Sequence, residues 1–193
     1  MWKKDPLDFS VGNKVANRKL SASITPTKVE RFFDKNEIIV SKTDLKGNLI
    51  YVNDVFLKIS SYVESDILGQ PHNIIRHPEM PRVIFQLLWK RIISGREIFA
   101  YVNNLASNGD NYWVIAHVTP SFDEQMNITG YHSSRRVPNV DILKSTIIPM
   151  YATLLQIEKS NSSRKVGLEE SAIRLNEIIK NTGVSYDEFI LSL

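Results

Sequence analysis

The sequence contains no cysteine among its 193 residues, and this absence excludes several kinds of chemistry. A chain without thiols has no disulfide framework, thiolate zinc site, iron–sulfur cluster, c-type haem attachment or cysteine nucleophile. A covalent adduct between a cysteine and a flavin is excluded for the same reason. The sequence also shows no metal-ligand spacing, nucleophile–base pair or phosphate-binding loop, so we expect no enzymatic activity.

Long apolar runs are also missing. No stretch approaches the roughly 20 residues that a helix needs to cross a bilayer, and the N-terminus lacks the apolar segment of a signal peptide. The sequence therefore predicts a soluble, cytoplasmic protein that is not an integral membrane protein. Such a protein would reach the inner face of the membrane only through a partner.

Positive charge is concentrated at the N-terminus. The chain has 24 Lys and Arg against 21 Asp and Glu, a net charge of +3. Residues 1–31 contain seven basic and three acidic side chains, residues 32–137 eleven of each, and residues 138–193 six and seven. Because the body of the chain is neutral, the basic pI does not indicate nucleic-acid binding.

The same three ranges are expected to be three structural parts. Residues 1–31 show neither a helical nor a strand period, and we predict a basic, flexible arm. Residues 32–137 combine strand signals with short helices and form the predicted globular domain. Residues 138–193 have helical spacing with a break at 160–167, and form a helical extension that packs on the sheet or mediates dimerisation.

Within the central range the pattern predicts an α+β fold. Two short strands are followed by short helical turns and a segment with three prolines, then by one longer helix over 80–95 that Gly95 ends, and by three more strands. Asn108-Gly109 is a strong hairpin signal between two of these strands. The strands are expected at 37–44, 49–53, 97–105, 110–122 and 127–138.

The order of these elements and three motifs resemble the PAS domain of the aerotaxis-receptor class of sensors. The motifs are GQPHNIIRHPEMP (69–81), NGDNYWV (108–114) and GYHSSRR (130–136). The resemblance covers residues 38–137 and implies a five-stranded antiparallel sheet with short helices over one face. It also implies non-covalent binding of FAD, whose redox state such domains report to a methyl-accepting chemotaxis transducer.

Seven residues are candidate contacts to the flavin, by the match to the family and by their chemistry. They are Asn53, Arg76, His77, Glu79, Trp89, Asn104 and Tyr112. Arg76 offers two parallel donors to a pyrophosphate, and its alternative role is a salt bridge with Glu79. The family motif usually ends in aspartate, so Glu79 keeps the charge on a longer side chain.

The other candidates have structural alternatives. His77 is a donor to the cofactor, a cap for the following helix or a haem ligand, and Trp89 is either core packing or a wall beside the flavin. Asn104 lies in a strand, where asparagine is disfavoured, so an inward amide there needs a partner or sits near a bulge. Tyr112 and Trp113 face opposite sides, because side chains alternate along a strand, and the resemblance implies that Tyr112 is the one that faces inward. Asn53 caps the first helix and also reaches toward the cofactor.

These residues suggest a redox sensor without catalytic residues or a metal site. Oxidised flavin N5 accepts a hydrogen bond and reduced N5 donates one, so the Asn104 amide is expected to rotate and to pass the change into the sheet. Two alternatives stay open: a cofactor-free or small-ligand PAS interaction module, and a haem-based gas sensor. The FAD hypothesis predicts a methyl-accepting chemotaxis transducer or another signalling protein as the partner.

Overall fold

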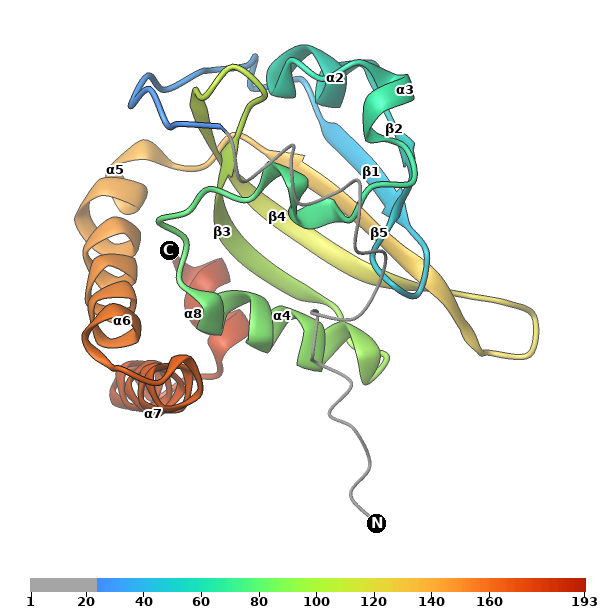
Figure 1. Ribbon diagram of the computed structural model, residues 1–193. Helices are drawn as coiled ribbons and strands as arrows, with labels where there is room; N and C mark the ends of the chain where they lie inside the picture. The colour runs from blue at the N-terminus through green and yellow to red at the C-terminus, as the bar shows by residue number, and fades with distance from the viewer. Residues whose placement is uncertain (1–23) are drawn as a thin grey trace.

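Five antiparallel strands form one sheet in the computed structural model, which describes residues 24–193 (Figure 1). The strands are β1 (Ile39–Thr43), β2 (Leu49–Val52), β3 (Ile98–Leu105), β4 (Asn111–Phe122) and β5 (Ile128–Arg136). Their order across the sheet is β2-β1-β5-β4-β3, so the first hairpin lies beside the last strand. The predicted α+β class and the five-stranded antiparallel sheet are therefore confirmed.

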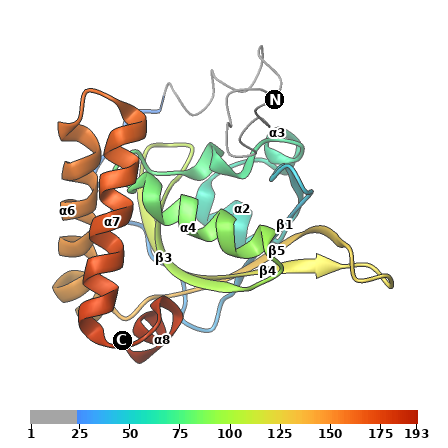
Figure 2. The same cartoon turned by 90° about the horizontal axis from the view of Figure 1, so that it is seen from below.

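Short helices between β2 and β3 cover one face of this sheet (Figure 2). They are α2 (Asp54–Ser60), α3 (Glu64–Ile67), the 3-10 helix η1 (His72–Ile75) and α4 (Arg82–Ile93). Asn53 begins α2, because its side chain accepts a hydrogen bond from Phe56 N. Pro81 lies directly before α4, where a missing N–H costs no helical hydrogen bond.

The face under these helices, which we call the inner face, holds the core. Along β4 the residues Tyr112, Val114, Ala116 and Val118 are buried, whereas the residues between them are half-buried. This alternation follows from the two-residue period of a strand, and it confirms that Tyr112 faces inward. Phe56 of α2 and fully buried isoleucines from α4 and β3 complete the apolar layer.

The chain after β5 is helical, as predicted. It forms α5 (Val140–Ile142), the π-helical turn η2 (Leu143–Ile147), α6 (Ile148–Ser160), α7 (Arg164–Thr182) and α8 (Tyr186–Ser192). The wide turn lies directly before Pro149, which has no N–H to donate to the preceding turn. Ser185 and Glu188 form a capping box at the start of α8.

The break between α6 and α7 is shorter than the predicted 160–167, because α7 already begins at Arg164. Gly167 is inside α7 and faces α6. A Cβ at this position would lie 2.9 Å from the backbone oxygen of Glu158, so the glycine permits a close approach of the two helices. Here the glycine is a helix-packing residue rather than a helix breaker.

The C-terminal helices lie along the free edge of β3 (Figures 1 and 2). Tyr151 of α6 donates from its hydroxyl to the backbone oxygen of Tyr101 at 2.8 Å. An edge strand exposes unpaired backbone groups, and this contact occupies one of them. Residues 138–193 therefore pack on the sheet, one of the two roles predicted for them.

Glu158 of α6 fixes the extension to the start of α4. Its Oε2 accepts from the backbone N and the Nε of Arg82, both at 2.9 Å, and its Oε1 accepts from Val83 N at 2.9 Å. The carboxylate is buried. It supplies the negative charge and the acceptors that a helix N-terminus requires, from a segment far along the chain.

Residues 24–31 lie against the β3–β4 hairpin, although they belong to the range predicted as a flexible arm. Thr27 N donates to Gly109 O at 2.8 Å and Arg31 N to Asn111 O at 2.7 Å. The rest of the predicted arm, residues 1–23, lies outside the described residues.

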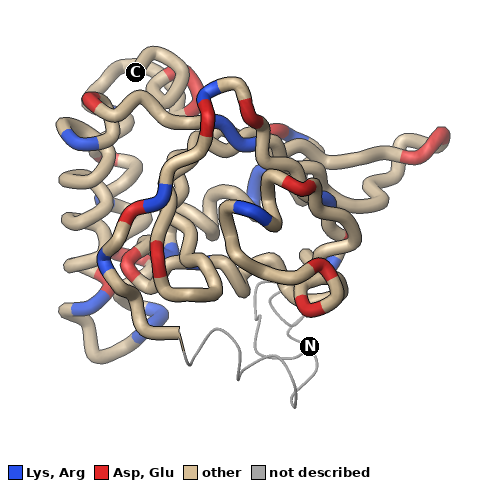
Figure 3. Tube along the Cα trace, turned by 90° about the horizontal axis from the view of Figure 1, so that it is seen from above, with Lys and Arg blue, Asp and Glu red and all other residues tan. Residues whose placement is uncertain are grey.

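Acidic and basic residues are interspersed along the described chain (Figure 3). This distribution agrees with the equal numbers of the two signs in residues 32–137. Within the part of the chain that the structure describes, no helix is both long and apolar enough to cross a membrane.

Replacing Glu158 with glutamine should lower the free energy of unfolding by about 2–4 kcal/mol, because the α4 N-terminus and Arg82 lose a buried charged acceptor. Glu169→Gln is the matched control, since Glu169 makes only an exposed pair with Lys165 at 3.9 Å. Its loss should stay below about 0.5 kcal/mol. Urea unfolding measures both, and equal losses would show that Glu158 does not hold the two segments together.

Candidate functional site

Four polar side chains on the inner face have atoms without a partner. They are Asn104 of β3, Tyr112 of β4, and Ser133 and Arg135 of β5, and all four are buried. The unpartnered atoms are Asn104 Nδ2, Tyr112 OH, Ser133 Oγ and Arg135 Nη1. A buried polar group left without a hydrogen bond costs about 1–3 kcal/mol. Several such groups on one face indicate a place where a ligand supplies the partners.

Sheet register brings the first two residues together. Asn104 and Tyr112 are directly opposite each other in the β3–β4 ladder, close to the hairpin. Burial raises the pKa of Tyr112 well above its ordinary value, and the nearby Tyr62 adds to the shift. The hydroxyl of Tyr62 is also buried without a partner. The Tyr112 phenol is therefore neutral at physiological pH and available as a donor.

Arg135 is held beside these groups by β1 and η1. Its Nη2 donates to Ser41 Oγ at 2.8 Å and to His72 Nε2 at 2.5 Å, and its guanidinium carbon lies 5.7 Å from the centre of the Phe56 ring. Burial, with a further contribution from the Arg135 charge, lowers the pKa of His72 to about 3. His72 is thus neutral, as an acceptor of this hydrogen bond must be.

Arg76 and His77 lie at the free edge of β3. Arg76 forms an antiparallel bridge with Asn104, and His77 N donates to Asn103 O at 3.4 Å. The Arg76 guanidinium donates to Met80 O at 3.0 Å and lies over the Phe85 ring, 4.2 Å from its centre. Burial lowers the pKa of Arg76 to about 10. It remains a cation at physiological pH, beside the start of α4.

The imidazole of His77 stabilises the turn that leads into α4. Its Nδ1 accepts a hydrogen bond from Glu79 N at 3.2 Å, and the ring is buried. Burial lowers the pKa of His77, so the ring is neutral and can accept this bond. His77 therefore does not cap α4, which begins at Arg82 after Pro81 without a side-chain cap; its hydrogen bond lies in the turn before the helix.

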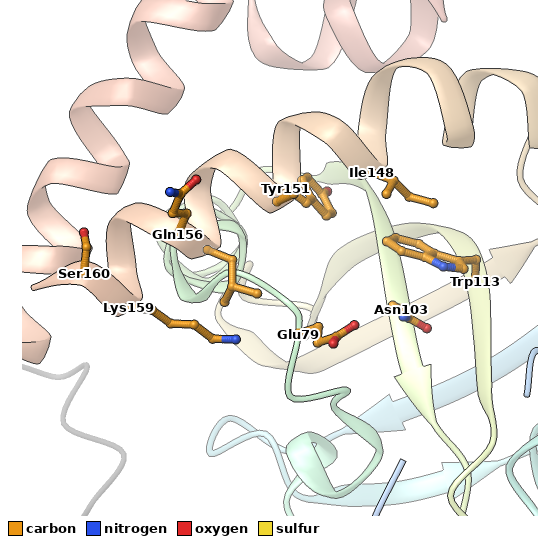
Figure 4. A pocket seen from close by; sticks show the side chains of 10 residues that line it. Glu79, Asn103, Trp113, Ile148, Tyr151, Gln156, Lys159 and Ser160 are labelled. Atoms are coloured by element: carbon orange, nitrogen blue, oxygen red, sulfur yellow. The ribbon is translucent and has the colours of Figure 1, made fainter. Parts of the chain in front are cut away.

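Glu79 faces a different site from the inner-face residues. It lines an open groove of about 610 Å³ between α6 and the opposite face of β3 and β4 (Figure 4). Lys159 of α6 extends toward the same groove. The other lining residues include Asn103, Trp113 and Tyr151. No salt bridge joins Glu79 to Arg76 among the ion pairs of the described residues, so the predicted alternative for Arg76 is not observed.

Trp89 of α4 packs against the β1–β2 turn. Its ring meets Tyr131 edge-on, with 5.4 Å between the centroids. At Gly47, where φ is +81°, a Cβ would lie 2.9 Å from the indole. The turn therefore requires glycine for its conformation and for the approach of the tryptophan. These contacts correspond to the core-packing alternative for Trp89.

The amide of Asn53 bonds three backbone groups. Its Oδ1 accepts from Val40 N at 2.9 Å and from Phe56 N at 3.1 Å, while its Nδ2 donates to Ile38 O at 2.8 Å. Asn53 thus joins β1 to the start of α2, which confirms the predicted cap. Its side chain forms these hydrogen bonds rather than bonds to Asn104, Tyr112, Ser133 or Arg135.

The structure therefore brings together Asn104 and Tyr112 from the predicted set. It adds Ser133, Arg135 and His72, which are not among the predicted contacts. The alternation in GYHSSRR could have placed Ser133 and Arg135 on one face. Which face is inward depends on the pairing of β5 with β1 and β4, which the sequence does not show.

Comparison with known proteins agrees with this fold. A family model described as PAS fold matches residues 49–135. The aerotaxis receptor of Escherichia coli (strain K12) is 37% identical over 117 residues, which are 60% of this chain and 22% of the receptor. A nitrogen fixation regulatory protein of Klebsiella pneumoniae is 23% identical over 128 residues, 66% of this chain and 26% of that protein. The chain thus spans about a quarter or less of these relatives.

Solved structures show the same fold at low sequence identity. A light-oxygen-voltage domain from a study with a flavin analogue has a TM-score of 0.51 and 18% identity, and covers 58% of this chain and 84% of that one. The dark structure of the blue-light photoreceptor Aureochrome1 LOV has a TM-score of 0.50 and 21% identity, and covers 58% and 82%. The resemblance to PAS domains is therefore confirmed.

The buried His72 should make stability depend on pH. Because the pKa of His72 is about 3 in the folded protein and 6.5 is its ordinary value, the unfolded chain binds a proton in this window that the folded chain does not. The free energy of unfolding therefore falls as pH is lowered from about 6.5 toward 3.

His72→Gln should make this dependence shallower when the free energy of unfolding is measured by urea at several pH values. His117→Gln is the control, because His117 is half-exposed on the opposite face and bonded to Glu97. It should not make the dependence shallower. An unchanged slope in His72→Gln would show that His72 is not a buried neutral acceptor.

Proposed function

We propose that this chain is a non-enzymatic sensor that binds FAD without a covalent bond, because residues 49–135 match a PAS-fold family model and the chain is 37% identical to an aerotaxis receptor over 117 residues. The observation that carries the proposal is the group of unpartnered atoms on the inner face, on Asn104, Tyr112, Ser133 and Arg135. An isoalloxazine ring has an apolar body and polar atoms along its edges, so it matches an apolar layer with a few convergent donors.

Bound flavin would supply reversible uptake of electrons, and the chain would convert that change into movement. The Nδ2 of Asn104 has no partner in the described chain, so the amide is free to turn its oxygen or its nitrogen toward a ring atom. A ring nitrogen that changes from acceptor to donor on reduction would favour the other orientation of the amide. A preference of a few kcal/mol is enough to shift a two-state population.

A continuous set of contacts leads from Asn104 to the C-terminal helices. The backbone of Asn104 pairs with Arg76, and the guanidinium of Arg76 holds Met80 O directly before α4. The first turn of α4 is bound by Glu158 of α6. We infer that rotation at Asn104 alters this connection and that the helical extension passes the change to a partner. A methyl-accepting chemotaxis transducer, met at the cytoplasmic face of the membrane, is the partner we propose.

Asn104→Ala should weaken FAD binding about tenfold, because one buried hydrogen bond of about 1.4 kcal/mol is lost. Binding is measured by titrating the purified protein with FAD and following the flavin absorption bands. The matched control is Asn103→Ala, since the neighbouring Asn103 lies on the opposite face and its Oδ1 is already bonded to Asn111. Proteolysis of oxidised and dithionite-reduced protein should differ in the wild type and not in Asn104→Ala.

Equal FAD affinity and equal redox-dependent proteolysis in the two variants would refute the role of Asn104. A Soret band in the purified protein would favour a haem-based gas sensor. Wild-type protein without any chromophore after incubation with FAD would favour a cofactor-free interaction module.

A further inference from the structure

Arg135 is a buried cation without a counter-ion. Its side chain is on the inner face of β5, and the whole residue is only 3% exposed. The partly buried arginines near α4 find carboxylates, Arg82 at Glu158 and Arg91 at Asp187. For Arg135 no carboxylate is within ion-pair distance among the residues that the structure describes. Its partners are a hydroxyl, a neutral imidazole and an aromatic ring.

The fold does not need this charge. Burial of an unpaired ion is unfavourable by several kcal/mol, and an apolar side chain of similar size avoids that penalty. The two groups that Arg135 bonds are also close to each other, because Ser41 Oγ and His72 Nε2 are 3.2 Å apart. They can remain bonded without the guanidinium. A costly group that the fold can replace indicates a functional role.

The free donor of Arg135 is on the same face as the proposed flavin contacts. Nη2 is occupied by Ser41 and His72, whereas Nη1 has no partner. The other unpartnered atoms of this face belong to Ser133, on the same strand, and to Tyr112, which interacts electrostatically with Arg135. A group that completes this site has to offer acceptor atoms to Nη1 and negative charge to the guanidinium.

We propose that Arg135 is the counter-ion for negative charge on the ligand of the inner face, so that the site binds reduced, anionic flavin more tightly than oxidised flavin. The identity of the ligand rests on the function proposed above. Electrons from a reductant, dithionite in the test, enter the ring, and charge that is not matched by proton uptake remains on it. Arg135 stabilises that charge across a hydrogen bond, and no bond to the protein forms or breaks.

The first test compares FAD affinity in the oxidised and the dithionite-reduced state under anaerobic conditions. Arg135→Gln should lower the ratio of reduced to oxidised affinity at least tenfold, equivalent to about 30 mV in the midpoint potential of a two-electron couple. Arg135→Lys should keep most of the ratio, because it retains the charge. Arg136→Gln is the matched control, since Arg136 is the next residue and is exposed. A wild-type ratio in Arg135→Gln would overturn the proposal.

The second test uses flavin-free protein and does not depend on the identity of the ligand. Arg135→Met should leave the melting temperature unchanged or raise it, because an uncompensated buried charge is removed and the contact between Ser41 and His72 stays. A lower melting temperature would show that Arg135 is a structural residue and would overturn the proposal. If the wild type binds no flavin, the proposed function fails, whereas this comparison still decides whether the fold needs Arg135.

Discussion

A guanidinium, an amide and hydroxyl groups that are buried between a sheet and its covering helices must find hydrogen-bonding partners there, because burial removes them from bulk water. On the inner face of this sheet that requirement is met only in part. The Nη2 of Arg135 has hydrogen-bonding partners, whereas its Nη1 has none. Asn104 Nδ2 and Tyr112 OH are also without a partner. The apolar packing around these groups raises the free-energy penalty of each missing hydrogen bond. It also raises the free energy gained when a ligand supplies the partner. The proposed flavin site follows from this imbalance.

The same region is tied to the C-terminal helices at two points. Tyr151 bonds the free edge of β3, the strand that contains Asn104, and Glu158 bonds the first turn of α4, so α6 contacts both elements. A change on the inner face therefore has a short route out of the domain. In the proposed function, the extension is the part of the protein that a partner would contact.

Features that depend on local sequence could be predicted. The hairpin at Asn108-Gly109 and the capping box from Ser185 follow from turn and cap chemistry, and both are present. Features that depend on the pairing of distant segments could not. The inward direction of Arg135 depends on the register of β5 with its neighbours. The contact of Glu158 with Arg82 spans 76 residues of sequence, and the groove that Glu79 lines exists only because α6 returns to the sheet.

The central claim is that the inner face, and not the groove beside α6, receives the ligand. Side-chain amide signals in a nitrogen–proton correlation NMR spectrum test this directly, since Asn104 and Asn103 are neighbours on opposite faces of β3. On addition of FAD, the Asn104 side-chain amide should shift strongly, while Asn103 and the indole of Trp113, which line the groove, should change little. Shifts confined to Asn103 and Trp113 would place the ligand in the groove and contradict the account.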